Sequence, residues 1–162
     1  MVLFLVCSLA LTSCSLAADA GDEMAQLSEP APQISLPDLD GNQVSLSDHL
    51  GEVVLLNYWN LGCPPCLDEF PTFEEIHAEY RDRGLVIIAI HVGGPTREVA
   101  EFAQAGPYTF TILVDEAVAV APPLPTTYVI DREGFVQHRW IGGPLEESEI
   151  LAQVEPYLST GE

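Results

Sequence analysis

The sequence predicts an α/β domain with a mixed central sheet, helices on both sides of the sheet, and a β-hairpin at its N-terminal end. Two observations predict this class. Continuous apolar runs at Val53–Trp59 and 85–91 are typical of strands buried on both faces, and a segment of helical spacing separates them. Further along, two strand-like segments flank a turn at residues 131–134, which adds an antiparallel hairpin to the parallel pair.

Each element has its own signal along the chain. Segments 33–36 and 43–46 are expected to pair, because the turn residues Asp38-Leu39-Asp40-Gly41-Asn42 lie between them, and Ser47 is expected to cap a short turn through Leu50. Large side chains at helical spacing then predict a helix that ends at Gly84: Leu67, Phe70, Phe73, Ile76, His77 and Tyr80. The remaining elements are a helix at Thr96–Ala105 ending at Gly106, a strand at 110–114, hairpin strands at Thr126–Ile130 and Phe135–Ile141, and a closing helix at 145–158.

The chain is strongly acidic. Its 162 residues include 25 Asp and Glu against 5 basic residues, all of them Arg, for a formal net charge of −20. Nucleic-acid binding relies on basic clusters that displace counterions, so this composition excludes that class of partner. It also argues against adhesion to anionic lipid headgroups. The surplus fits a solvated acidic surface, or a protein adapted to high salt, where screening weakens self-repulsion.

The N-terminal segment predicts export. Residues 1–13 are apolar or small and too few to span a bilayer, which is typical of a signal peptide. The segment 11–14 resembles a bacterial lipobox, in which Cys14 would carry the lipid, although no basic residue precedes the apolar run. The alternative is ordinary signal cleavage near Ala17, Ala18 or Ala20. We therefore expect an extracytoplasmic protein that touches the membrane only through a lipid anchor.

Three regions follow from this interpretation: a signal peptide at 1–13, a flexible acidic tether at 14–32 and a folded domain at 33–162. With Cys7 in the leader and Cys14 at the lipid site, the domain retains only Cys63 and Cys66. A pair this close in sequence forms too small a loop to stabilise a fold much, so it serves reactivity or metal binding.

A metal site is not expected. Zinc takes four ligands, the sequence has no second C-x-x-C, and the histidines lack ligand spacing. All four histidines are interpreted as ordinary surface or edge residues: His49, His77, His91 and His138.

The position of Cys63 favours redox chemistry. It follows a buried strand and a short bend, and it precedes Pro64 and Pro65, which the first turn of a helix tolerates. A cysteine at a helix N-terminus is acidified by unpaired N–H groups and the helix dipole, and the thiolate is the attacking species. Cys66 lies one turn deeper, within reach for a disulfide, as two-step exchange requires.

Several segments together resemble the TlpA/ResA-like thioredoxin-fold family. The active-site segment is Trp59-Asn60-Leu61-Gly62-Cys63-Pro64-Pro65-Cys66-Leu67-Asp68-Glu69-Phe70-Pro71, and Leu124-Pro125-Thr126-Thr127 resembles the cis-proline loop. The turn at 38–41 and the segment 46–48 match the N-terminal hairpin. The resemblance extends from about Pro32 to Leu158. It implies a thioredoxin-like three-layer sandwich and a thiol–disulfide oxidoreductase without a cofactor.

The resemblance also implies roles for individual residues. Cys63 would be the nucleophile and Cys66 the resolving thiol of a redox-active disulfide, while Pro125 would be cis and hold the loop beside them. Substrate binding is implied for three residues around the pair: Trp59, Leu124 and Thr126. Glu69 would tune the proton chemistry, with its pKa raised by burial and like charge. Asn57 stands where ordinary thioredoxins carry a buried Asp.

Two departures from the family pattern affect the expected groove. Gly62 occupies the position of the family's second Trp, which makes the mouth of the site less apolar. The stretch 116–124 is short, so the helix normally found there is expected to shrink to a turn.

The leading hypothesis is an extracytoplasmic reductase of protein disulfides of the cytochrome c maturation type. The resemblance implies apocytochrome c as client and a membrane thiol-transfer protein as electron donor. Three alternatives stay open: a general disulfide oxidant or isomerase, a peroxiredoxin, and a copper-delivery protein. The peroxiredoxin pattern requires Thr and Pro where this chain has Asn60 and Leu56. The copper pattern requires a C-x-x-x-C pair with a remote histidine, for which His138 would be the candidate.

Overall fold

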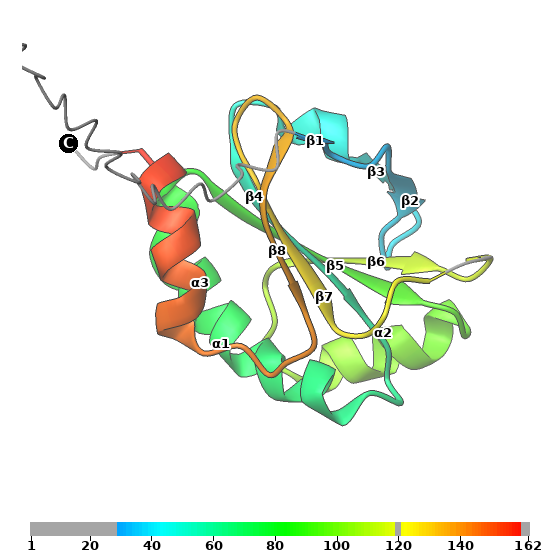
Figure 1. Ribbon diagram of the computed structural model, residues 1–162. Helices are drawn as coiled ribbons and strands as arrows, with labels where there is room; N and C mark the ends of the chain where they lie inside the picture. The colour runs from blue at the N-terminus through cyan, green and yellow to red at the C-terminus, as the bar shows by residue number, and fades with distance from the viewer. Residues whose placement is uncertain (1–28, 119–120, 160–162) are drawn as a thin grey trace, which may run out of the picture.

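The computed structural model describes residues 29–118 and 121–159 (Figure 1). Three predictions lie outside this part of the chain: the signal peptide at 1–13, the lipobox at 11–14 with Cys14, and the tether through residue 28. Among the described residues, no helix has the length and apolar character needed to cross a bilayer.

The sheet is mixed, as predicted. Its strand order is β1-β8-β7-β4-β5-β6, with β4, β5 and β6 parallel and β7 antiparallel to β4. The strands are β1 (Glu29–Pro30), β4 (Val53–Trp59), β5 (Leu85–Val92), β6 (Thr111–Asp115), β7 (Thr126–Ile130) and β8 (Phe135–Ile141). β4 lies in the middle of the sheet, and six of its seven residues are buried, which explains why all of them except Asn57 are apolar or aromatic.

The sequence predicted helices on both sides of the sheet, but the α-helices of the described residues lie on one side only. α1 (Pro64–Tyr80), α2 (Thr96–Ala105) and α3 (Glu147–Val154) all contribute to one core cluster on one face (Figure 1). The chain steps from β4 to β5 to β6 in a single direction, so right-handed connections place α1 and α2 on the same side. The described residues between β6 and β7, 116–118 and 121–125, contain a turn and no helix.

The opposite face is covered by the N-terminal hairpin, the third layer of the sandwich. Its strands are β2 (Ser35–Pro37) and β3 (Gln43–Ser45), and the 3-10 helix η1 (Leu46–His49) follows. Leu36 and Val44 of this hairpin pack against a second core cluster that includes Ile90.

Several boundaries differ from the sequence predictions. The tether was predicted to run to residue 32, but Glu29 and Pro30 pair with β8. The cap of η1 is Ser45, not Ser47: the Ser45 N–H donates to the Asp48 carboxylate at 3.0 Å. The helix predicted at 145–158 is divided into α3 and the 3-10 helix η3 (Glu155–Tyr157), and another 3-10 turn, η2 (Arg81–Arg83), leads from α1 to Gly84.

Aromatic packing fixes α1 against the sheet. Phe70 is fully buried, with its ring centroid 4.4 Å from that of Trp59 and 5.3 Å from that of Phe110. Truncating such a side chain costs about 3–5 kcal/mol. α1 continues through Pro71 to Tyr80, so this cluster determines where the first turn of the helix, with its cysteines, meets the end of β4.

Candidate active site

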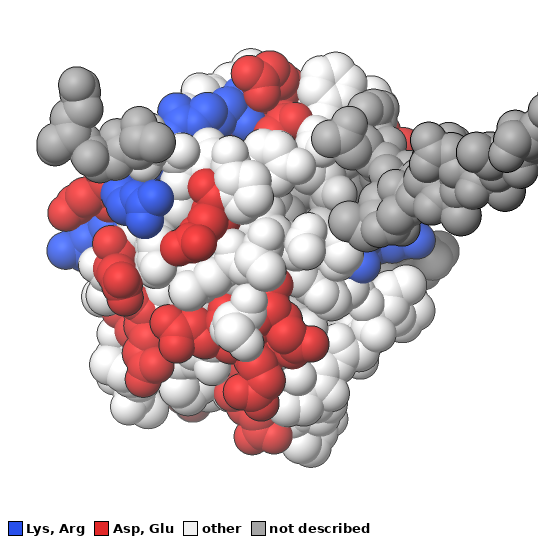
Figure 2. All heavy atoms as spheres, turned by 60° about the vertical axis from the view of Figure 1, so that its left-hand side comes forward, with Lys and Arg blue, Asp and Glu red and all other residues white. Residues whose placement is uncertain are grey.

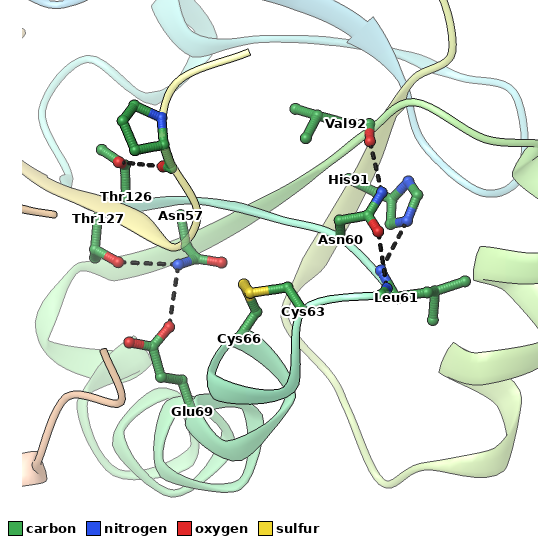
Figure 3. Close-up of a disulfide and its surroundings, with 12 residues drawn as sticks. Asn57, Asn60, Leu61, Cys63, Cys66, Glu69, His91, Val92, Thr126 and Thr127 are labelled. Carbon is green, nitrogen blue, oxygen red and sulfur yellow. Dashed lines mark hydrogen bonds between the residues drawn. A yellow bond between two sulfur atoms is a disulfide. The ribbon is translucent and has the colours of Figure 1, made fainter. Parts of the chain in front are cut away.

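Cys63 and Cys66 form a disulfide at the N-terminus of α1 (Figure 3). Cys63 is the N-cap residue, with Pro64 and Pro65 in the first two helical positions, as predicted. The Cys63 carbonyl accepts the N–H groups of Cys66 at 3.0 Å and Leu67 at 3.2 Å. Cys66 is fully buried, whereas Cys63 is partly exposed. Cys63 is therefore the more accessible of the two cysteines.

A buried carboxyl group lies one helical turn beyond Cys66. Glu69 has no exposed surface, and its oxygens accept the Leu145 N–H at 3.1 Å and the Asn57 side-chain amide at 3.4 Å. Burial raises the pKa of Glu69 to about 7, although both hydrogen bonds act in the opposite direction. This carboxyl group can therefore gain or lose a proton near neutral pH.

Asn57 connects this carboxyl group to the sheet. Its side-chain amide nitrogen also donates to the Thr127 hydroxyl at 2.9 Å, while its oxygen is buried and has no donor among the described residues. In Figure 3 that oxygen points toward the side on which the disulfide lies. Asn57 cannot ionise, so Glu69 is the titratable group in this pocket.

The loop before β7 confirms one prediction and corrects two. The Leu124–Pro125 peptide bond is cis, as the resemblance implied, and Leu124 is half-buried at the surface. Thr126 and Trp59, however, are 1% and 0% exposed, so neither side chain can contact a substrate. The Thr126 hydroxyl donates to the Pro123 carbonyl at 2.6 Å and so shapes the loop, while Trp59 lies in the core beneath the site.

A segment that the sequence analysis did not single out closes the pocket around Glu69. The Gly143–Pro144 peptide bond is also cis, and a Cβ on Gly143 would collide with the Glu69 carboxylate and lie 3.0 Å from Pro125 Cγ. The Gly142 N–H donates to the Pro125 carbonyl at 2.8 Å. The Gly-Gly-Pro run directly after a strand signals an unusual backbone, but only the folded chain shows what it approaches.

The loop ahead of Cys63 is held by side chains from two strand ends. The His91 ring nitrogen Nε2 lies 3.2 Å from the Leu61 nitrogen, and the Asn60 amide donates to the Val92 carbonyl at 2.8 Å. The Asn60 oxygen in turn accepts the Gly62 N–H at 2.8 Å. His91 is only 2% exposed, which corrects its interpretation as an ordinary surface or edge residue.

Metal ligation finds no support in the described part of the chain. No group of three or more His, Cys, Asp or Glu side chains there is arranged to hold an ion. His138, the candidate for a copper site, pairs with Val129 within the β7–β8 hairpin and packs edge-on against Trp140, with ring centroids 4.3 Å apart.

Comparisons with known proteins agree with this geometry. The model of the AhpC/TSA family matches residues 27–139. The thiol-disulfide oxidoreductase ResA of Geobacillus thermodenitrificans is 36% identical over 130 residues, covering 77% of this chain and 74% of that protein. The Bacillus subtilis ResA is 33% identical over 155 residues, covering 93% and 86%. The crystal structure of a putative thiol:disulfide interchange protein DsbE from Chlorobium tepidum aligns with a TM-score of 0.72 and 30% identity, covering 80% and 94%.

Proposed function

This chain belongs to the AhpC/TSA family and is a thiol–disulfide oxidoreductase of thioredoxin-like fold, and on that premise we propose that it reduces disulfides of client proteins outside the cytoplasm. One observation carries the proposal. The partly exposed Cys63 at a helix N-terminus is joined to a buried Cys66, and a carboxyl group whose pKa is about 7 lies one turn further along the same helix.

In the first step of the reaction, the Cys63 thiolate attacks one sulfur of the client disulfide. A bond forms between Cys63 and that sulfur, the client S–S bond breaks, and the other client sulfur leaves as a thiolate. The helix N-terminus favours the attacking thiolate. The family resemblance implies that an extended client segment would lie against the half-buried Leu124 and the cis-Pro125 loop.

In the second step, Cys66 resolves the mixed disulfide. Its proton passes to the Glu69 carboxylate, and the resulting Cys66 thiolate attacks the Cys63 sulfur. The client sulfur leaves as its second thiolate, so two electrons have moved to the client and the protein retains the Cys63–Cys66 disulfide. A thiol donor must then reduce this disulfide, for which we propose a membrane thiol-transfer protein.

We further propose apocytochrome c as client, on the family resemblance, and a lipid anchor at Cys14, on the lipobox-like segment 11–14. The charge distribution suits a basic client, because acidic side chains gather over the face that α1 and α3 build (Figure 2). Exposed members of this face include Asp68, Glu75, Glu79, Glu147 and Glu149. Electrostatic attraction of this kind speeds encounter with oppositely charged partners.

The alternative functions have weaker support. A peroxiredoxin site would need Thr and Pro at the positions that Asn60 and Leu56 occupy here. The Asn60 side chain instead donates to the Val92 carbonyl and accepts the Gly62 N–H. A disulfide oxidant or isomerase would share the same thiols and differ in reduction potential. A measured potential near the −120 mV of strong oxidants would therefore overturn the reductase proposal.

Trapping in cells tests the client. The Cys66→Ser variant lacks the resolving thiol, so Cys63 should accumulate as a mixed disulfide with its clients, which mass spectrometry can identify. Cys63→Ser is the matched control and should trap none of them. Apocytochromes among the trapped partners would support the proposal. A broad set of secreted proteins without apocytochromes would replace it with a general reductase, and an absence of mixed disulfides would contradict it.

A further inference from the structure

We propose that His91 is a positioning residue for Cys63: its neutral imidazole accepts the Leu61 N–H and so holds the loop that carries the nucleophile. This role goes beyond the proposed function. It depends on thiol–disulfide exchange at Cys63, whichever client is used and whichever way electrons flow.

Strand register places His91 beneath the loop. In the parallel β4–β5 ladder, Trp59 and His91 form the last pair, and the chain leaves β4 directly after Trp59. The His91 ring meets the Trp59 ring edge-on, with centroids 4.9 Å apart and planes at 83°. The imidazole is thus packed in the core with one edge toward the backbone of the active-site loop (Figure 3).

The hydrogen bond to Leu61 determines the tautomer of His91. A backbone N–H can only donate, so Nε2 must present a lone pair, and the proton of the neutral ring must be on Nδ1. Nδ1 is buried and has no partner among the described residues. A buried unpaired donor is costly. Among the described residues, Nε2 is thus the ring nitrogen with a hydrogen-bond partner, and that partner belongs to the active-site loop.

Asn60 provides the second attachment of the same loop. Its side chain links the Val92 carbonyl to the Gly62 N–H, and its own carbonyl accepts the Cys63 N–H at 3.0 Å. Gly62 contributes no side chain that could pack the loop down. Hydrogen bonds from the end of β5 therefore maintain the conformation in which Cys63 caps α1.

Protonation of His91 would break this arrangement, because an Nε2–H would face the Leu61 N–H. Burial lowers the pKa of His91, against the opposing effects of the Gly93 backbone and of the Glu98 carboxylate on α2. The neighbouring strands place the uncharged Trp59 and Val114 beside it. The imidazole is therefore kept in the neutral form that the loop requires.

Two substitutions distinguish the effect of the His91 hydrogen-bond acceptor from that of the volume of its ring. His91→Gln keeps a side-chain acceptor that does not titrate, at about the distance of Nε2 from the backbone, whereas His91→Leu keeps an apolar side chain and has no acceptor. His138→Leu, a histidine in the β7–β8 hairpin, is the matched control. In the reduced proteins, the alkylation rate of Cys63 by iodoacetamide against pH reports its thiolate, and this readout needs no client.

We expect the Leu variant to alkylate about fivefold more slowly at pH 7, the factor that one ordinary hydrogen bond represents, and its Leu61 amide to exchange faster with solvent. The Gln variant should restore both, and the control should match the unsubstituted protein. Nitrogen NMR should find the proton of His91 on Nδ1. A proton on Nε2, or a Leu variant with unchanged alkylation and Leu61 exchange, would overturn the proposal. So would lost thermal stability with an unchanged alkylation profile, which would indicate a purely structural role.

Discussion

The two sulfurs of the disulfide have different surroundings. Beyond Cys66 lies a buried pocket built by α1, β4, β7 and the segment after β8, and its carboxyl group, Glu69, has a pKa of about 7. Ahead of Cys63 lies a loop attached by hydrogen bonds to the end of β5, where His91 is kept neutral. In the mechanism we propose, proton transfer takes place on the Cys66 side and positioning of the nucleophile on the Cys63 side.

The largest expected effect comes from Glu69 on the Cys66 side, which should make the free energy of unfolding depend on pH. The pKa of Glu69 rises from 4.5 to about 7 on folding, so between these values the folded oxidised protein binds a proton that the unfolded chain has lost. Its contribution to stability is complete below pH 4.5 and is lost as the pH rises through 7, by an amount on the order of 3 kcal/mol. Denaturant unfolding at pH 4.5 and pH 8 should show this loss in the unsubstituted protein and not in Glu69→Gln. Equal losses in both proteins would contradict it.

The same substitution should slow turnover. Without the carboxylate, the proton of Cys66 has no buried acceptor, and general base catalysis contributes on the order of 10²-fold or more. In the unsubstituted protein, the rate of mixed-disulfide resolution should rise with pH through about 7, because Glu69 becomes a base there.

Stopped-flow reduction of a model disulfide measures this rate, and Glu69→Gln should show no inflection near neutral pH. Asp68→Asn is the matched control, since it removes one negative charge from an exposed neighbour on the same helix. If both variants lost activity equally, the effect would be one of overall charge, not of proton transfer.

A smaller effect on stability should distinguish Gly143, on the Cys66 side of the site, from Gly62, on the Cys63 side. Gly143→Ala places a methyl group against the Glu69 carboxylate and Pro125, so we expect a loss of about 1–3 kcal/mol in unfolding free energy and a changed pH profile. At Gly62 an added Cβ would meet only the Asn60 oxygen, at 3.2 Å. Gly62→Ala should therefore change stability by about 0.5 kcal/mol or less and leave the pH profile unchanged. Equal effects at the two positions would argue against a pocket confined to the Cys66 side.

Local signals predicted the parts of the site that lie close together in the chain. Cys63 is the N-cap of α1 because a buried strand and a short bend precede it and two prolines follow it in the first helical positions. The bounds of β4, α2, β7 and β8 also match their predictions, since apolar runs, hairpin turns and terminal glycines are local patterns. The cis-proline at Pro125 came from the family resemblance and is confirmed.

Contacts between distant segments escaped the sequence analysis. His91 looked ordinary, because only the β4–β5 register brings it under Leu61. The family resemblance implied substrate binding for Trp59 and Thr126, yet both side chains are buried. Likewise, nothing in the chain next to Gly143 indicates that it lies against Glu69.

The sequence by itself determined which chemistry this protein carries, because two cysteines three positions apart at a helix N-terminus need only one turn of backbone to meet. The tertiary structure decided the ionisation of the side chains around that pair. It places Glu69 near its half-ionised state by burying it against Asn57 and Leu145, and it keeps His91 neutral beneath the loop. Ionisation depends on the solvent and charges that surround a group, and those come from segments up to 76 residues away in the chain.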